Sequence, residues 1–393
     1  MYLLADANLP ELDSLVAVVA RQSGLALQLE RFGGRLPSAE QLARAEAMFI
    51  RSVTKVDAQL LAQAPKLRWL GSATIGTDHV DQAAVQAAGL SFHSTPGVNA
   101  NAVGDYVASA AAALALQRGG LPEGEVAIVG AGNTGRAAGQ RLAGLGLSVH
   151  YYDPPLLEQG SSTLAVHDDW QRVLNSQVIS CHVPLQREGP HPTWHMFDAE
   201  ALAQLAPGAW LINASRGPVI AEQALLNRLQ QQSDLDVVLD VWEHEPQISA
   251  ALLPYLQLAT PHIAGHSLAG KLGGSWQLLN KWLTDQQLSL QLPSLATLLG
   301  RYPQGQIQGL RADKAPDWQQ LAHWILRCYD IRKDDAALRA VPCTPAEFDA
   351  LRAQYAVRSE LNQLHLSTGD WADSVAWQQR LAQLTFQTAT QEE

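Results

Sequence analysis

Cysteines and long apolar runs are scarce in this sequence. Only three cysteines occur in 393 residues, Cys181, Cys328 and Cys343, and none forms a CxxC pair. This gives neither a disulfide framework nor a thiol redox motif, so we expect a reducing, cytoplasmic environment. The most apolar stretch, residues 107–116, is far shorter than the roughly 20 residues that cross a bilayer. The first six residues include Asp6 and no basic side chain, so we expect no targeting segment.

Basic residues are also in deficit. Lys and Arg total 27 against 38 Asp and Glu, which gives a net charge of −11. This balance argues against a nucleic-acid or anionic membrane surface as the main partner, although a local basic pocket remains open. Hydrophobic residues make up 47% and charged residues 17% of the chain. Those fractions are typical of a globular protein, and the length fits two or three domains.

Short apolar runs alternate with helical patterns over the first ninety residues. We expect strands at 2–5, 25–29, 48–50, 69–70 and 90–92, and helices at 11–22, 38–45, 57–64 and 80–88. Alternation at this spacing predicts a parallel sheet with helices on both faces.

A second alternating series follows a long alanine-rich helix at 101–116. Its expected strands are 126–129, 148–152, 178–182, 210–213, 237–241 and 256–259, with helices that include 134–145 and 221–230. Six parallel strands connected by helices indicate a doubly wound, Rossmann-like domain that binds a dinucleotide.

The pattern changes near residue 290, and the remainder reads as a separate α/β module. Helical spacing relates Trp318, Leu321, Ile325, Cys328 and Tyr329. Residues 344–347 have the pattern of a capping box with proline at the first helical position. The face of the following helix is marked by Phe348, Leu351 and Tyr355. The predicted fold class is therefore α/β, with two doubly wound parallel-sheet domains and a C-terminal α/β module.

A GxGxxG motif joins the strand at 126–129 to the helix that follows it. Its glycines are Gly130, Gly132 and Gly135. They permit the tight turn, the approach of a pyrophosphate to the backbone, and close packing of helix on strand. Asp153, 18 residues after Gly135, ends the next strand, where a carboxylate binds ribose hydroxyls and repels the 2′-phosphate of NADP. We therefore expect NAD, the alternative being a turn aspartate before Pro154.

Three polar segments follow later strands of the second series, at 213–217, 240–246 and 260–265. The carboxyl ends of parallel strands form the ligand-binding edge of such a sheet. Arg216 offers a planar fork for a carboxylate. His262 can act as a general base near neutral pH, and Glu245 can orient its ring. Each alone fits a structural role, but together they predict oxidation of a 2-hydroxy acid.

These segments resemble those of the D-isomer-specific 2-hydroxyacid dehydrogenase family, over roughly residues 1–285. The resemblance implies a catalytic set of Arg216, Glu245 and His262. It implies a flavodoxin-like substrate-binding domain at 1–98 and 263–288 and a Rossmann domain at 99–262. It also implies a homodimer in which the helix at 101–116 packs against the partner subunit.

A closer likeness, to family members that oxidise a phosphorylated four-carbon acid, extends over nearly the whole chain. It is carried by residues 50–56, 72–81, 238–243 and 262–267, and it implies that residues 289–393 are a dimerisation domain. It implies substrate contacts at Ser52, Thr74 and His266. At the position of His266 the family usually has Tyr. The implied NAD contacts are Asn133, Thr134, Asp153, Val183, Ala214, Ser215, Arg216, Asp240 and Gly265, with Val183 in place of the usual Thr.

Arg51 and Lys55 are our candidates for the substrate phosphate, because an anion site in an acidic protein needs local cations. Both could equally be solvated charges at a strand end. Two further functions stay open: another 2-hydroxyacid dehydrogenase of phosphoglycerate or hydroxypyruvate type, and an NAD(H)-sensing protein without turnover. The His191/His195 and His262/His266 pairs have i, i+4 spacing, but Pro192 and Gly265 interrupt a helix there, so we expect no metal requirement.

Overall fold

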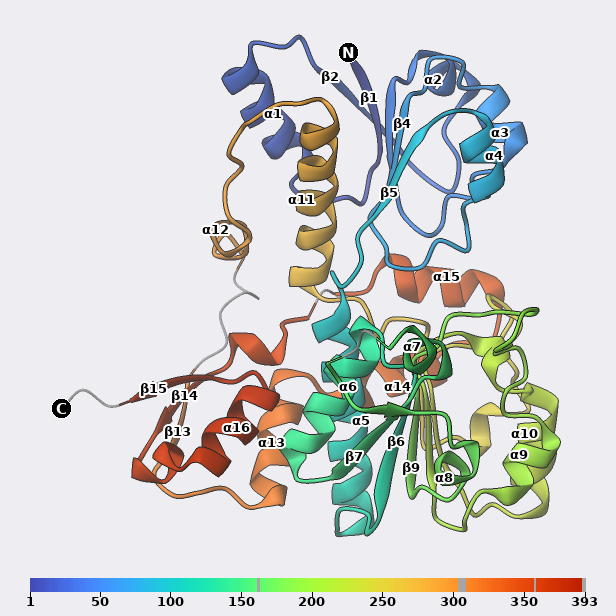
Figure 1. Ribbon diagram of the computed structural model, residues 1–393, viewed down its shortest axis with the longest axis vertical. Helices are drawn as coiled ribbons and strands as arrows, with labels where there is room; N and C mark the ends of the chain where they lie inside the picture. The colour runs from blue at the N-terminus through green and yellow to red at the C-terminus, as the bar shows by residue number, and fades with distance from the viewer. Residues whose placement is uncertain (161–162, 303–308, 357, 391–393) are drawn as a thin grey trace. The chain divides into compact units, whose positions relative to one another are not determined.

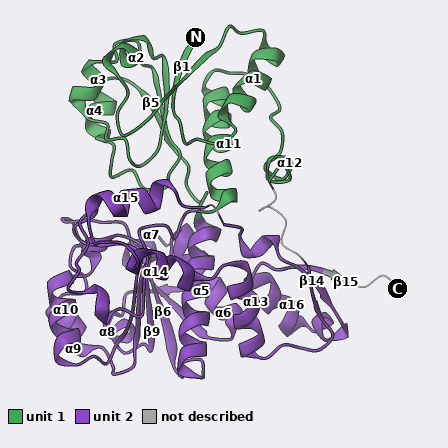
Figure 2. Ribbon diagram, turned by 180° about the vertical axis from the view of Figure 1, so that it is seen from behind, with its two compact units in different colours: residues 1–99, 267–305 green, residues 100–266, 306–393 purple. Residues whose placement is uncertain are grey.

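The computed structural model describes residues 1–160, 163–302, 309–356 and 358–390. The chain divides into two compact units, Met1–Asn99 with Ser267–Gly305 and Ala100–His266 with Gln306–Glu393 (Figures 1 and 2). The C-terminal residues, for which we expected a separate domain from 289, are shared between the two units. In the described ranges no helix is both long and apolar enough to cross a membrane.

The first unit contains a parallel sheet of order β2-β1-β3-β4-β5, which is the 2-1-3-4-5 order of flavodoxin-like folds. The expected doubly wound sheet is thus confirmed. Its strands are β1 (Tyr2–Asp6), β2 (Gln28–Phe32), β3 (Ala47–Ile50), β4 (Trp69–Ser72) and β5 (Ser91–Ser94). Its helices are α1 (Leu12–Ser23), α2 (Ala39–Arg44), α3 (Ala58–Ala62), α4 (Gln82–Ala87), α11 (Leu268–Asp285) and α12 (Leu295–Leu299).

The strand expected at 25–29 lies further along the chain. Gln28 is the first residue of β2, where it pairs with Tyr2, and Leu25 is 39% exposed. β2 is an edge strand whose residues are mostly half-exposed, so apolar content does not mark it. β1, by contrast, is buried at all five positions and was located correctly.

The second unit contains a parallel sheet of order β12-β11-β10-β9-β6-β7-β8, which extends the 3-2-1-4-5-6 order of Rossmann folds. Its strands are β6 (Glu125–Val129), β7 (Ser148–Tyr152), β8 (Val166–His167), β9 (Val178–Cys181), β10 (Trp210–Asn213), β11 (Asp236–Leu239) and β12 (Leu258–Ala259). Its first helices are α5 (Ala100–Arg118), α6 (Asn133–Leu145), α7 (Pro154–Gln159), α8 (Trp170–Leu174), α9 (Ala199–Gln204) and α10 (Glu222–Gln231). Sequence patterns missed β8, because its two residues are half-exposed and form no apolar run.

The C-terminal residues form a small α/β module within the second unit. Its parallel sheet has the order β13-β14-β15. The elements are β13 (Leu310–Ala312), α13 (Trp318–Cys328), α14 (Ile331–Arg339), α15 (Pro345–Ala353), β14 (His365–Thr368), α16 (Val375–Gln383) and β15 (Gln387–Thr390). Thr344 caps α15 as expected, but the helix ends before Tyr355.

The alanine-rich helix α5 is enclosed by its own chain. Every residue from Ala102 to Ala115 is buried, and α6, α13 and α14 pack against the helix. Ser109 donates to the carbonyl of Tyr329 at 2.7 Å, which fixes the start of α14. The expectation that this helix packs against a partner subunit is therefore wrong, because the C-terminal module covers it.

Candidate active site

The glycine loop joins β6 to α6 and leaves the helix N-terminus open. Gly130 has a left-handed φ of 96°, and a Cβ there would lie 2.7 Å from the carbonyl oxygen of His182. A Cβ on Gly135 would lie 1.9 Å from the carbonyl oxygen of Gly130. Gly132 is the N-cap residue, and a Cβ there would meet no atom within 4 Å. The loop therefore fits a pyrophosphate, with Asn133 and Thr134 opening the helix.

A cavity of about 430 Å³ lies beside this loop at the end of β7. Its lining includes Gly130, Gly132, Tyr152, Asp153, Pro154, His182, Val183, Gln186 and Met196. Asp153 accepts the Ala131 amide at 2.7 Å and the Leu156 amide at 3.0 Å, so it also caps α7. The cofactor and turn interpretations of Asp153 are thus compatible: the carboxylate is fixed by the backbone on the wall of the cavity.

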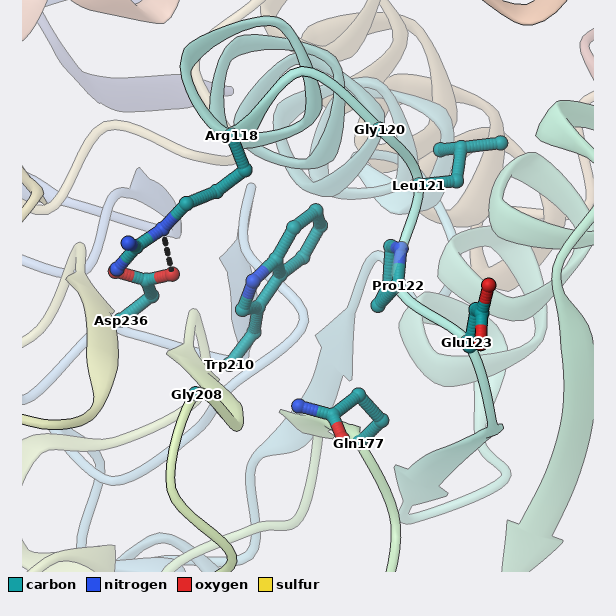
Figure 3. Close-up of a pocket in the computed structure, with 9 residues that line it drawn as sticks. All are labelled: Arg118, Gly120, Leu121, Pro122, Glu123, Gln177, Gly208, Trp210 and Asp236. Carbon is teal, nitrogen blue, oxygen red and sulfur yellow. Dashed lines mark hydrogen bonds and ion pairs between the residues drawn. The ribbon is translucent and has the colours of Figure 1, made fainter.

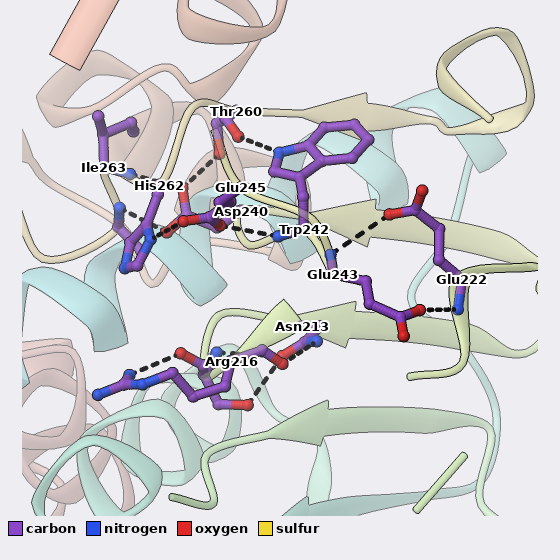
Figure 4. A network of polar contacts seen from close by, with 12 residues as sticks. Asn213, Arg216, Glu222, Asp240, Trp242, Glu243, Glu245, Thr260, His262 and Ile263 are labelled. Atoms are coloured by element: carbon purple, nitrogen blue, oxygen red, sulfur yellow. Dashed lines mark hydrogen bonds and ion pairs between the residues drawn. The ribbon is translucent and has the colours of Figure 1, made fainter. Parts of the chain in front are cut away.

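Arg216 follows β10 and is supported by a local network (Figure 4). The Asn213 carboxamide accepts from the amide and hydroxyl of Ser215 and donates to the carbonyl of Arg216, at 2.8–3.1 Å. Arg216 Nη1 donates to the carbonyl of Ser215 at 2.8 Å. In Figure 4 the Arg216 guanidinium and the His262 ring lie at one end of the view, and Glu222 lies at the other. The sequence predicted that Arg216 follows this strand, and the structure shows that the Asn213 carboxamide holds the loop of Arg216.

Asp240 organises the loop that carries His262. One oxygen accepts the Ile263 amide and the Thr260 hydroxyl, both at 2.7 Å, and the other accepts the Ala264 amide at 2.9 Å. Its carbonyl accepts the His262 amide at 2.7 Å. Because Asp240 is 1% exposed, these bonds are shielded from water. The NAD contact expected of Asp240 stays a prediction beside this internal role.

His262 and Glu245 form a directed pair (Figure 4). Nδ1 of His262 lies 2.7 Å from Oε2 of Glu245, and Oε1 of Glu245 accepts the Trp242 amide at 2.8 Å. Burial raises the pKa of Glu245, but the His262 charge and these hydrogen bonds outweigh it and leave the pKa below its usual value. His262 has a φ of 55°, a strained conformation that occurs often at active sites. Glu245 thus orients the His262 ring through Nδ1, and the role of His262 as a base stays a prediction.

The substrate residues expected near the N-terminus belong to the first unit. Ser52 is exposed in the turn after β3. Thr74 Oγ1 lies 2.8 Å from Ser72 Oγ, which in turn lies 2.8 Å from Nε2 of His79. Sequence reasoning missed Ser72 and His79, although both lie in the 72–81 segment that it singled out. The substrate roles of Ser52 and Thr74 stay predictions.

The two cations expected at the phosphate differ in their surroundings. Arg51 forms an ion pair with the buried Asp6 at 3.0 Å, and its side chain is 29% exposed. Lys55 is 79% exposed and pairs with Asp57 at 3.7 Å, which matches the solvated alternative. Lys271 on α11 was missed: burial and, next, the charge of Arg51 lower its pKa. The cation whose charge is felt together with that of Arg51 is therefore Lys271.

His266 and Gly265 continue the loop after His262. The His266 ring lies edge-on to the Tyr355 ring, with centroids 5.8 Å apart. Sequence reasoning missed Tyr355 as a neighbour of this loop, because the two residues are far apart in the chain. The substrate contact of His266 and the NAD contact of Gly265 stay predictions.

The two histidines of the His191/His195 pair bind different carboxylates. His191 pairs with Glu158 at 2.8 Å, and His195 pairs with Glu243 at 2.7 Å. Among the described residues, no group of three His, Cys, Asp or Glu side chains is placed to hold a metal ion. The carboxylates therefore engage each histidine separately.

A second cavity, of about 380 Å³, lies at the opposite edge of the sheet, where β9, β10 and β11 begin (Figure 3). The Arg118 guanidinium pairs there with the buried carboxylate of Asp236, and Trp210 and Gln177 line the wall. None of the predicted site residues lines it. It is separate from the strand ends that carry Arg216 and His262.

Known proteins resemble this chain over most of its length. A family model described as the NAD binding domain of D-isomer specific 2-hydroxyacid dehydrogenases matches residues 104–264, and a domain of unknown function matches residues 302–384. The erythronate-4-phosphate dehydrogenase of Idiomarina loihiensis is 46% identical, covering 90% of each chain. That of Aeromonas salmonicida is 39% identical, covering 96% of this chain and 98% of that protein.

Solved structures match the fold. The 3-phosphoglycerate dehydrogenase of Entamoeba histolytica, bound to NAD+, superposes with a TM-score of 0.61 at 20% identity, covering 75% of this chain and 99% of that chain. A D-lactate dehydrogenase of Treponema pallidum gives a TM-score of 0.57 at 22% identity, covering 74% and 99% of the two chains. The two parallel sheets and the NAD-binding motif are therefore those of D-isomer-specific 2-hydroxyacid dehydrogenases, and the predicted cofactor, NAD, is confirmed. Within that class, the chain belongs to the family of erythronate-4-phosphate dehydrogenases.

Proposed function

We propose that the chain oxidises the 2-hydroxyl of 4-phospho-D-erythronate to 3-hydroxy-2-oxo-4-phosphooxybutanoate with NAD, a step of pyridoxal 5′-phosphate biosynthesis. The observation that carries the proposal is 46% identity to an erythronate-4-phosphate dehydrogenase across 90% of both chains. The His262–Glu245 pair supports it independently, because this oxidation requires a base at the hydroxyl.

The proposed mechanism assigns one task to each polar group. Arg216 binds the substrate carboxylate through its planar guanidinium, held by the Ser215 carbonyl. His262 accepts the hydroxyl proton at Nε2 while Glu245 fixes the ring through Nδ1. Bound NAD supplies the acceptor for the hydride that leaves C2. The positive charge that develops on the imidazole lies beside the Glu245 carboxylate, which stabilises it.

The proposed cofactor contacts follow from the glycine loop. The open N-terminus of α6 binds the pyrophosphate, and Asp153 accepts the ribose hydroxyls with the lone pairs that its two backbone amides leave. Val183 lines the same cavity, and only its backbone can donate or accept there. These contacts favour NAD over NADP, since Asp153 would repel a 2′-phosphate.

The proposed phosphate site consists of Arg51 with Lys271. The charge of Arg51 lowers the pKa of Lys271, which means that the two cations repel each other when no anion is bound. A dianionic phosphate near both would remove that repulsion and form charge-assisted hydrogen bonds. This proposal replaces Lys55, whose exposed side chain pairs with Asp57.

A panel of substrates tests the function. The purified chain is given NAD and either 4-phospho-D-erythronate, 3-phosphoglycerate or unphosphorylated erythronate, and NADH formation is followed by absorbance. We expect kcat/KM to be highest for 4-phospho-D-erythronate. A preference for 3-phosphoglycerate would assign another dehydrogenase activity, and NADH binding without turnover of any hydroxy acid would favour a sensing protein.

We also propose that the chain acts as a homodimer, which rests on its family resemblance. Because α5 is enclosed, we expect the partner to contact other surfaces of the chain. Sedimentation equilibrium at micromolar concentration tests this, and a monomer mass would contradict it.

A further inference from the structure

Arg358 of the C-terminal module reaches the loop that carries His262. Its guanidinium is buried, with the residue 8% exposed, and Nη2 donates to the carbonyls of Ala264 and Ala102 at 2.8 Å each. Ala264 lies two residues after His262, and Ala102 lies in the first turn of α5. One cation of the module thus joins the catalytic loop to the long helix.

The same loop is held on its other side by Asp240. The Ala264 amide donates to Asp240 at 2.9 Å while the Ala264 carbonyl accepts from Arg358. Two residues further along, the His266 ring packs against the ring of Tyr355, which also belongs to the module. The Ala264 amide is therefore bound by the Rossmann part and the Ala264 carbonyl by the C-terminal module.

A buried polar cluster keeps Arg358 and Tyr355 in place. The Asp334 carboxylate accepts the hydroxyls of Tyr329 and Tyr355 at 2.8 and 2.9 Å. The Arg358 guanidinium lies 3.8 Å from the centre of the Tyr329 ring, a cation–π contact. Burial raises the pKa of Asp334, and the Arg358 charge opposes that rise. These contacts together define the position of the Arg358 guanidinium.

We propose that Arg358 and Tyr355 are positioning residues of the dehydrogenase reaction: the C-terminal module clamps the 262–266 loop and so fixes His262 against its substrate. The proposal rests on the proposed function and adds a catalytic task to a module described only as a domain of unknown function. A base must stand within hydrogen-bond reach of the hydroxyl, so a loop that moves by a fraction of an ångström loses rate.

Arg380 provides a matched control in the same module. Its Nε and Nη2 donate to the carbonyls of Gly144 and Leu145 at 3.0 and 3.1 Å, and its guanidinium lies 4.4 Å from the Trp377 ring centre. Like Arg358, it attaches the module to the Rossmann part through two carbonyls and an aromatic ring. The two differ in their acceptors: those of Arg380 lie at the C-terminal end of α6, outside the catalytic loop.

The experiment compares R358M and R380M with the wild type in the full chain. Wild-type turnover of the hydroxy-acid panel is measured first, so a failure of the proposed function appears in the wild type itself. We expect both variants to lower Tm, R358M to lower kcat by about 10- to 100-fold, and R380M to keep kcat within about twofold. NADH affinity should change much less than kcat in R358M, because the glycine loop is untouched and Gly265 is the one predicted NAD contact in the clamped loop. The pH at which kcat/KM falls on the acidic side of its pH profile should shift in R358M and stay unchanged in R380M.

Equal kcat values for R358M and R380M, or an unshifted acid limb in R358M, would overturn the proposal. Should R358M not fold, Y355L decides, since it removes the ring beside His266 but leaves the Arg358 contacts and the Tyr329 hydroxyl bond to Asp334 in place. We expect Y355L to lower kcat by at least about threefold with unchanged NADH affinity. A wild-type kcat in Y355L would then refute the clamp.

Discussion

Nδ1 of His262 lies 2.7 Å from Oε2 of Glu245, while the second oxygen of that carboxylate accepts the Trp242 amide at 2.8 Å. The carboxylate is thus fixed by the backbone on one side and orients the imidazole on the other. His262 itself has a positive φ, and its amide donates to the Asp240 carbonyl. The pair is held by two adjacent loops, so its geometry is a property of the folded sheet edge.

Removing the base should abolish most turnover. We expect H262A to lower kcat/KM by about 10²- to 10⁴-fold, the usual contribution of general-base catalysis. H93N is the matched control, because His93 also lies 2.7 Å from a carboxylate, that of Asp285, but in the first unit. H93N should keep kcat/KM within about twofold of wild type. Initial rates of NADH formation measure both, and an active H262A would refute the assignment.

Activity should decline when the general base is protonated. An imidazolium has no lone pair to accept the hydroxyl proton, so we expect acid to lower kcat/KM. Glu245 adds no second step there, because its pKa lies below the ordinary value of 4.5 and it stays ionised. Rates measured between about pH 5 and 9 check this. A flat profile would contradict the role of His262.

The lowered pKa of Glu245 also predicts how stability depends on pH. Its stabilising contribution is present above the ordinary pKa of 4.5 and is lost as the pH falls through the lowered value. The difference in urea midpoint between wild type and E245Q should therefore be larger at about pH 6 than at about pH 3.5. A difference that is the same at both pH values would contradict this linkage.

Selectivity for a phosphorylated substrate should depend on Arg51 and Lys271. R51E and K271M should raise KM for 4-phospho-D-erythronate at least about tenfold and change KM for unphosphorylated erythronate much less. K55M is the control, since Lys55 is 79% exposed and pairs with Asp57. Steady-state kinetics with both substrates measure the ratio. Equal effects on the two substrates would rule out a phosphate contact.

The sequence predicted the strand ends well because hydrophobic burial determines them. Arg216, Glu245 and His262 each follow a strand whose residues are almost all buried, and such runs are visible as apolar stretches. The edge strands β2 and β8 were predicted poorly, since both are largely half-exposed, whereas the buried edge strand β12 was predicted. Periodicity carries no signal for β2 or β8.

Contacts between distant segments could not be predicted. Arg358 and Ala264 are 94 positions apart, and Lys271 and Arg51 are 220 apart, so no local pattern relates them. The enclosure of α5 was missed for the same reason. The pattern of its residues predicts an apolar helix, but it does not indicate whether a partner subunit or the C-terminal module covers that helix.

Gly132 offers a test that separates cofactor binding from folding. A Cβ at this position meets no atom within 4 Å, and its φ of −70° is accessible to alanine. G132A should therefore keep the Tm of the wild type without cofactor. The added methyl would lie where the pyrophosphate approaches the N-terminus of α6, so we expect the Kd for NADH to rise at least about tenfold.

G33A is the matched control, because Gly33 is equally open and lies after β2 in the first unit. It should leave both Tm and the Kd for NADH unchanged. Tm is measured by differential scanning fluorimetry and the Kd for NADH by fluorescence titration. An unaltered Kd in G132A would mean that the dinucleotide does not approach this loop, and the proposed cofactor contacts would then have to be reassigned. A loss of stability in G132A without cofactor would instead show that Gly132 is required for packing, as Gly135 is, where a Cβ would lie 1.9 Å from the Gly130 oxygen.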